Sequence, residues 1–215
     1  CGGRRKPNAD PSTNRQQRRR ASAITSATIS SARFPAASAL KFTTNRCRNT
    51  ASATASGTSL ALTVPAAGVA AGNTLILTFV MDPTAGAVSC GDTRGNVFTN
   101  NVDITNGAGI AGARTVICSS PITTALVAGD TITVTHPSVA ARAVSVHEFS
   151  GLSGVADRTA STTGTSTAPA SGFTAVTLQA DELVLGAVGV ETGGESFIGG
   201  AGYTALPPSS TGTSG

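Results

Sequence analysis

Short hydrophobic segments separated by turn residues follow one another from residue 57 onward. Residues 59–64 (Ser-Leu-Ala-Leu-Thr-Val) and 131–136 (Thr-Ile-Thr-Val-Thr-His) alternate apolar and polar side chains, which is typical of strands with one buried face. Residues 74–81 form a continuous apolar run ending at Asp82-Pro83, which indicates a strand in the middle of a sheet. The same reasoning predicts further strands at 88–92, 97–105, 113–120, 141–149, 173–178 and 183–190.

Turn residues separate these segments, and no helical period is present. Asp92-Thr-Arg-Gly-Asn96 favours a tight turn, and residues 106–112 favour a Gly-rich hairpin loop. Residues 66–73, 128–130 and 150–154 are expected to be turns as well. Short strands divided by frequent turns predict an all-β fold, an antiparallel β-sandwich of the jelly-roll or immunoglobulin-like kind with about eight or nine strands.

The first part of the chain has a different character. Residues 1–48 carry eleven basic side chains and a single acid, Asp10, whereas the rest carries four basic residues and ten acids. Arg-rich sequence with little apolar content does not bury enough surface to fold. We therefore predict a disordered arm or linker over 1–48, with weak strand signals at 23–29 and 39–44, and a sandwich domain over 49–215.

The amino-acid composition agrees with the predicted all-β fold. Charged residues make up 12% of the sequence, Trp is absent, and Gly, Ala, Ser and Thr dominate. An average domain is about 25% charged, and helical bundles favour Leu, Glu and Lys. The composition therefore suits short strands and small-residue turns.

Four segments carry a family resemblance. They are Ala-Gly-Asp-Thr-Ile-Thr-Val-Thr at 128–135, Ala-Val-Ser-Val-His-Glu-Phe-Ser-Gly-Leu at 143–152, Ala-Asp-Glu-Leu-Val-Leu-Gly-Ala at 180–187, and Gly-Tyr-Thr at 202–204. Over about residues 55–205 the chain resembles bacterial extracellular β-sandwich domains of large secreted or cell-wall proteins. The resemblance implies a sandwich without known catalytic residues. Members continue past Gly-Tyr-Thr into a last strand, which we expect the domain over 49–215 to lack, so we expect an open sheet edge and self-association through it.

The cysteines give a structural expectation. Cys90 and Cys118 lie in predicted strands on either side of a hairpin, so a disulfide between them is expected; two separate buried thiols are the alternative. Cys1 and Cys47 have no evident partner. No C-x-x-C spacing is present, so we expect no zinc site, and we expect no cofactor.

Catalysis is not expected. His136 and His147 are the only histidines, and Glu148 follows His147 on a strand, where neighbours point to opposite faces. The acids lie mostly at turns, where they cap the backbone. Asp92 with the carbonyls near Asn96 is the best local candidate for calcium, although no metal site is predicted.

Two kinds of ligand remain open. Tyr203, in a Gly-rich loop, is the one aromatic residue expected to be available for stacking on a carbohydrate. The arm could neutralise nucleic-acid phosphates without sequence preference through Arg4, Arg5, Lys6, Arg18, Arg19 and Arg20.

These observations support a non-catalytic structural or adhesion module at the cell surface or outside the cell, with a protein or glycan ligand that the sequence does not identify. Recognition is expected in loops such as 106–112 and 191–202. A virion structural protein with a nucleic-acid-binding arm and a carbohydrate-binding accessory domain are the alternatives. No stretch of about 18 apolar residues is present, so no membrane span is expected.

Overall fold

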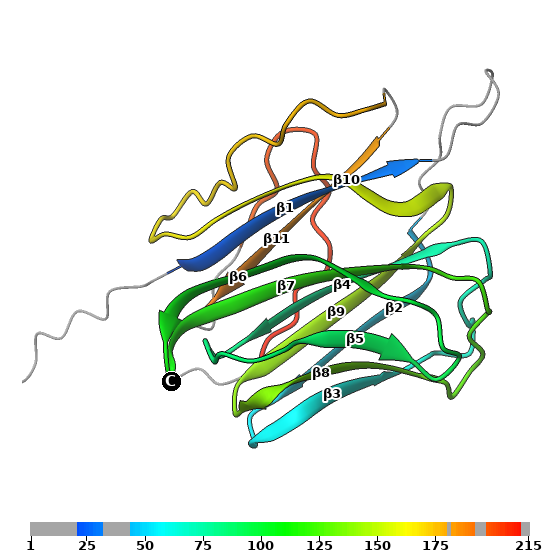
Figure 1. Ribbon diagram of the computed structural model, residues 1–215, viewed down its shortest axis with the longest axis horizontal. Coiled ribbons are helices and arrows are strands. Elements are labelled where there is room, and N and C mark those ends of the chain that lie inside the picture. Colours follow the sequence, from blue (N-terminus) through cyan, green and yellow to red (C-terminus); the bar gives the residue numbers. More distant parts are fainter. Residues whose placement is uncertain (1–20, 32–43, 180–181, 192–196, 212–215) are drawn as a thin grey trace, which may run out of the picture.

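The computed structural model describes residues 21–31, 44–179, 182–191 and 197–211, and these form an all-β, antiparallel sandwich without a helix (Figure 1). This confirms the fold class predicted from the sequence. The eleven strands are β1 Ala21–Ser31, β2 Thr44–Ala53, β3 Gly57–Thr63, β4 Thr74–Met81, β5 Ser89–Asp92, β6 Thr99–Ala108, β7 Ala111–Pro121, β8 Thr131–Val139, β9 Arg142–Phe149, β10 Leu152–Thr162 and β11 Glu182–Val190.

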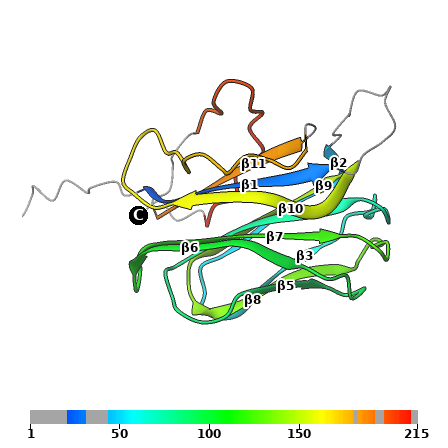
Figure 2. The same ribbon diagram turned by 45° about the horizontal axis from the view of Figure 1, so that its top comes forward.

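The strands form three sheets. Sheet A has the order β10-β1-β11, sheet B the order β2-β9-β4-β7-β6, and sheet C the order β3-β8-β5. Sheet B lies between the other two, and the layers are seen in Figures 1 and 2. Because both faces of sheet B are covered, its central strand β4 is almost continuously buried, as the apolar run at 74–81 predicted.

Each face of sheet B contributes to a separate hydrophobic core. Leu75, Leu77 and Phe79 of β4 point toward sheet C, where they meet inward side chains such as Ile132 and Val134 of β8. The opposite face of sheet B packs against sheet A. This smaller core is formed by Ile76, Val102, Ile117, Phe149, Leu152 and Leu185.

From residue 57 onward, the strand boundaries agree with the sequence prediction to within about three residues, except in two places. Residues 173–178, predicted as a strand, form no strand, and Phe173, Val176 and Leu178 are exposed there. A strand that was not predicted, β10, covers Leu152–Thr162. Its Ser, Thr, Asp and Arg residues hide the apolar alternation, because only Leu152 and its near neighbours reach the core.

The N-terminal region contributes two strands. β1 lies between β10 and β11 in sheet A, at the position of the weak signal at 23–29. β2 begins at Thr44 and pairs with β9 at the edge of sheet B, so the expected boundary at residue 48 falls inside this strand. The other parts of the predicted arm lie outside the described residues.

Candidate functional site

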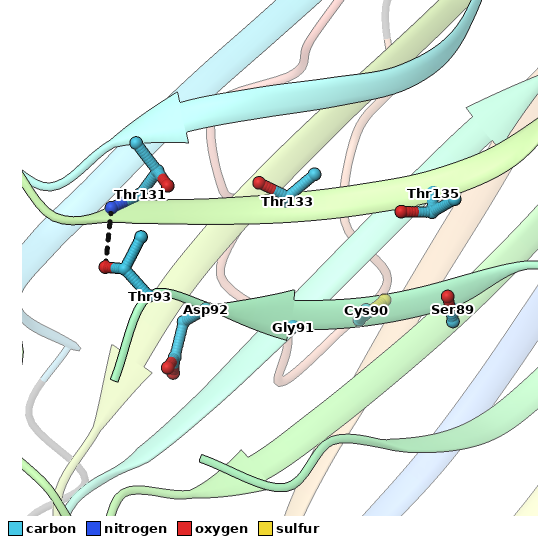
Figure 3. A pocket seen from close by; sticks show the side chains of 8 residues that line it. All are labelled: Ser89, Cys90, Gly91, Asp92, Thr93, Thr131, Thr133 and Thr135. Atoms are coloured by element: carbon cyan, nitrogen blue, oxygen red, sulfur yellow. Dashed lines mark hydrogen bonds between the residues drawn. The ribbon is translucent and has the colours of Figure 1, made fainter. Parts of the chain in front are cut away.

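A shallow hollow of about 270 Å³ lies on the outer face of sheet C, between β5 and β8 (Figure 3). Alternation along β8 creates this face. Ile132 and Val134 point into the core and are essentially fully buried, so the threonines between them point outward. The hollow is lined by Ser89, Cys90, Gly91, Asp92, Thr93, Thr131, Thr133 and Thr135.

The strand register sets these outward residues in rows across sheet C. Thr135 lies between Ser59 and Ser89, and Thr133 lies between Ala61 and Gly91. Residues two apart on a strand are separated by about 6.7 Å, and neighbouring strands by about 4.8 Å, so the rows form a regular grid. The nine positions of this hydroxyl grid are Ser59, Ala61, Thr63, Ser89, Gly91, Thr93, Thr131, Thr133 and Thr135.

The third row of the grid continues beyond the end of β5. Thr131 pairs with Thr63 on one side, and on the other it meets Thr93. Thr93 N–H donates to the Thr131 carbonyl over 3.0 Å, and Thr131 N–H donates to Thr93 Oγ1 over 3.2 Å. Seven of the nine grid residues therefore bear a hydroxyl, and none is charged.

A network of hydrogen bonds holds the turn at one end of the hollow. The Asp92 carboxylate accepts hydrogen bonds from the backbone N–H of Arg94 at 2.8 Å and from Asn96 Nδ2 at 2.9 Å. Asn96 Oδ1 in turn accepts from the backbone N–H groups of Thr123 and Thr124, both at 2.9 Å. Asp92 therefore caps its own turn, which is the structural alternative to the calcium interpretation.

An ion pair joins this turn to the start of β8. Arg94 Nε donates to Asp130 Oδ2 over 2.7 Å, and Val127 N–H donates to the same oxygen over 2.7 Å. The hydrogen bond from Arg94 is the main cause that lowers the pKa of Asp130. Because both carboxylates at this end are already hydrogen-bonded, the hollow presents mainly hydroxyl groups.

The expected disulfide lies beneath the grid. Cys90 of β5 and Cys118 of β7 are joined, with their Cα atoms 6.5 Å apart, so the bond links sheet C to sheet B. The prediction from the sequence is confirmed. β5 has only four residues and, among the described strands, pairs only with β8. The disulfide therefore gives this short strand a covalent attachment to the central sheet.

The two histidines lie in different cores and not in the hollow. The His136 ring stacks on Phe79 with a centroid distance of 5.2 Å, inside the core between sheets B and C. Ser145 Oγ lies 2.8 Å from His147 Nε2, and both side chains are buried on the face of sheet B toward sheet A. Burial lowers the pKa of His147 to about 4.

Among the described contacts, none joins a carboxylate to His147, so the serine–histidine pair is not extended to a triad. Glu148 points to the opposite face of β9, as strand alternation requires. Its Oε1 accepts from Ala70 N–H at 3.1 Å and from Asn73 Nδ2 at 2.6 Å, while Oε2 accepts from Cys47 N–H at 3.2 Å. Glu148 thus binds the backbone of β2 and the loop before β4.

The other sequence candidates lie away from the hollow or outside the described residues. Tyr203 is 55% exposed in a turn closed by its N–H and the Gly200 carbonyl. The segment that follows residue 197 begins on the sheet A side of the molecule, away from sheet C (Figure 2), and Ser209 Oγ near its end donates to the Ala51 carbonyl of β2 over 3.2 Å. The loop predicted at 106–112 is shorter in the structure, because β6 continues to Ala108 and β7 begins at Ala111. The basic residues Arg4, Arg5, Lys6, Arg18, Arg19 and Arg20 are not among the described residues.

In the part of the chain that the structure describes, no group of three or more His, Cys, Asp or Glu side chains is placed to hold a metal ion. The same part has no helix long and apolar enough to cross a membrane. No protein-family model, curated protein or solved structure matches this chain.

The hydroxyl grid was missed at the sequence level, although part of its signal was present. The repeated Thr-x-Thr-x-Thr of residues 131–135 shows that one face of that strand is uniformly hydroxylic. The sequence does not show that β3 and β5 flank β8. Only that pairing brings Ser59 and Ser89 beside Thr135.

Proposed function

We propose that this chain is a non-catalytic adhesion or structural module, working outside the cell or at its surface, and that it attaches through the hydroxyl grid of sheet C. The observation that carries this proposal is the grid itself, with seven hydroxyl groups in registered rows on a face that no other sheet of the described residues covers. A hydroxyl group both donates and accepts hydrogen bonds.

The chemistry of the grid favours an uncharged, hydroxyl-rich polymer, that is, a neutral polysaccharide. Such a polymer presents donors and acceptors at regular intervals, and several weak contacts along one chain add up to useful affinity. The shallow hollow over Thr133 would seat part of the polymer. The positions flanking Thr133 are Ala61 and Gly91, so the centre of the grid is open to close approach.

Two other observations support a site of action outside the cell. Disulfides persist in oxidising compartments, and the Cys90–Cys118 bond joins two sheets of the sandwich, with Cys118 fully buried. The resemblance of residues 55–205 to modules of secreted and cell-wall proteins supports the same location.

Binding to insoluble neutral polysaccharides tests the proposal. The full chain is mixed with cellulose or chitin particles, and the bound fraction and any released sugars are measured. We expect saturable binding without release of reducing ends, and a loss of at least about tenfold in affinity for Thr133→Lys, because a lysine there forces a charged amine against the polymer.

The matched control is Thr159→Lys, which adds the same charge at an exposed position on β10 in sheet A. This variant should bind as the unmodified chain does. Equal losses in the two variants, or release of soluble sugars by the unmodified chain, would count against the proposal. Absence of binding to both polysaccharides would count against the proposed ligand class.

A further inference from the structure

Among the described residues, each of the three sheets has two outer strands, which pair with a neighbouring strand on one side only. These are β10 and β11 in sheet A, β2 and β6 in sheet B, and β3 and β5 in sheet C. An open edge can pair with a strand of another chain, and proteins discourage this with short strands, bulges and charged side chains. The six edges differ strongly in this respect.

Five of the edges carry such a feature within the described residues. β5 has only four residues. β2, β3, β6 and β10 each contain a shift of register against the neighbouring strand, which interrupts a flat edge. β10 also carries Asp157 and Arg158, and β6 carries Asp103.

β11 is the exception. Its register with β1 is continuous from Glu182 to Gly189, and the one shift falls at its last residue. Residues 183–190 contain neither a charged residue nor a proline. Val184 and Val188 are 39% and 38% exposed, so apolar side chains stand on the outward face of this edge strand.

The sequence of β11 is also self-complementary about Gly186. In an antiparallel pair centred there, Val184 of one copy lies opposite Val188 of the other, and the two Gly186 residues face each other. On the inner face, Leu185 lies opposite Ala187, a large side chain against a small one. The two Glu182 carboxylates are at opposite ends of the pair, so like charges do not meet.

From this we infer that β11 is a dimerisation edge, and that its partner is β11 of a second copy of this chain in antiparallel register about Gly186. The contact is isologous, because the same residues are contributed by both copies and a two-fold axis passes between the Gly186 residues. It joins the two A sheets into one continuous six-stranded sheet, in the order β10-β1-β11-β11-β1-β10. This inference does not depend on the proposed function of sheet C.

Sedimentation of the full chain over a range of concentrations tests the oligomeric state. We expect a reversible equilibrium between one and two chains. Val188→Lys should raise the dissociation constant by at least about tenfold, because the substitution occurs twice in a two-fold contact. Val155→Lys, at an exposed position of β10 on the opposite edge of sheet A, should leave the equilibrium unchanged.

Cross-linking at Gly186 tests the register. A Cβ at Gly186 has no heavy atom within 4 Å, so Gly186→Cys fits the folded chain. Directly opposed residues of antiparallel strands have Cα atoms about 4.5–5.5 Å apart, within the range that a disulfide spans. We expect Gly186→Cys to form a covalent dimer under mild oxidation, and adding Val188→Lys to suppress it.

The unmodified chain and Val155→Cys are the controls for this cross-link. A covalent dimer that forms no faster with Gly186→Cys than with Val155→Cys would overturn the register. A chain that sediments as a single copy at every concentration would overturn the dimer itself, and growth into open oligomers would overturn the closed two-fold contact.

Discussion

Cys90 of β5 and Cys118 of β7 form a disulfide that crosses from sheet C to sheet B, with their Cα atoms 6.5 Å apart. The bond closes a loop with a sequence separation of 28 residues. In the chain-entropy description, closing a loop of this length raises the free energy of the unfolded state by about 3.5 kcal/mol. The disulfide therefore contributes a large part of the stability that a single domain of this size possesses.

Reduction of this disulfide should lower the thermal midpoint by roughly 7–14 °C, since one kcal/mol shifts a domain of this size by about 2–4 °C. The measurement is calorimetry with and without a reductant. The double variant Cys90→Ala, Cys118→Ala should melt at the lower temperature under both conditions. Equal midpoints for the oxidised and reduced chain would contradict a stabilising role.

The free thiol of Cys47 should resist modification in the folded chain. Cys47 is 1% exposed, and burial, with the nearby Glu148 carboxylate, raises its pKa to about 11. A protonated and inaccessible thiol is a poor nucleophile. In a Cys1→Ser variant, which leaves Cys47 as the only unpaired cysteine, a thiol reagent should label Cys47 only after denaturant is added. Rapid labelling of the native chain would show that this part of the core opens readily.

His147 should make stability fall as the solution becomes acidic. Its folded-state pKa of about 4 lies below the ordinary histidine value of 6.5, so between these two values the unfolded chain binds a proton that the folded chain does not bind. This contribution is complete above about pH 6.5 and is lost as pH falls toward 4, by on the order of 3 kcal/mol in total. Denaturant titrations of the chain and of His147→Gln should therefore diverge between pH 6.5 and 5, and parallel curves would contradict the expectation.

Removal of the Glu148 carboxylate should destabilise the fold more than removal of any one of its donors. Glu148→Ala leaves one buried and two partly buried donors without an acceptor, which costs about 3 kcal/mol. Asn73→Ala removes one donor and should cost about 1 kcal/mol. Chemical unfolding of both variants gives the comparison. A smaller loss for Glu148→Ala than for Asn73→Ala would show that the carboxylate is not the centre of this contact.

Two glycines of the β6–β7 hairpin should respond differently to alanine. Gly112 has φ 122°, and a Cβ there would overlap the Asn106 carbonyl oxygen, whereas a Cβ on Gly109 meets nothing within 4 Å. Gly109→Ala should cost about 1 kcal/mol for its left-handed backbone alone. Gly112→Ala should cost at least about 3 kcal/mol, because steric overlap is added. Unfolding free energies within error of each other would contradict this difference.

The sequence predicted the strands whose pattern is local. The predicted strand 74–81 has the same bounds as β4, because burial of both faces gives a continuous apolar run. β8 was predicted because burial of one face gives an alternation of apolar and polar residues. β10 was missed because it contacts the core mainly through Leu152 near its start, so little alternation remains in its second half. Residues 173–178 were predicted as a strand from their apolar side chains, but these side chains are exposed and the segment forms no strand.

The candidate site was less predictable than the fold. The Cys90–Cys118 bond followed from two cysteines in neighbouring strand segments. The hydroxyl grid depends on which strands pair and in which register, and β3 and β5 are brought to β8 from far apart in the chain. Residues such as Thr133 and Ser89 have no distinctive local pattern, so the sequence directed attention to Tyr203 and the loops instead.

The most direct test of the adhesion account compares two substitutions in one binding measurement on neutral polysaccharide. Thr133→Lys changes the centre of the hydroxyl grid, and Tyr203→Ala removes the aromatic ring that the sequence favoured. The account predicts a loss of at least about tenfold in affinity for Thr133→Lys and unchanged binding for Tyr203→Ala. If Tyr203→Ala lost binding while Thr133→Lys still bound the polysaccharide, the account would be contradicted, and the binding site would lie on the sheet A side of the molecule.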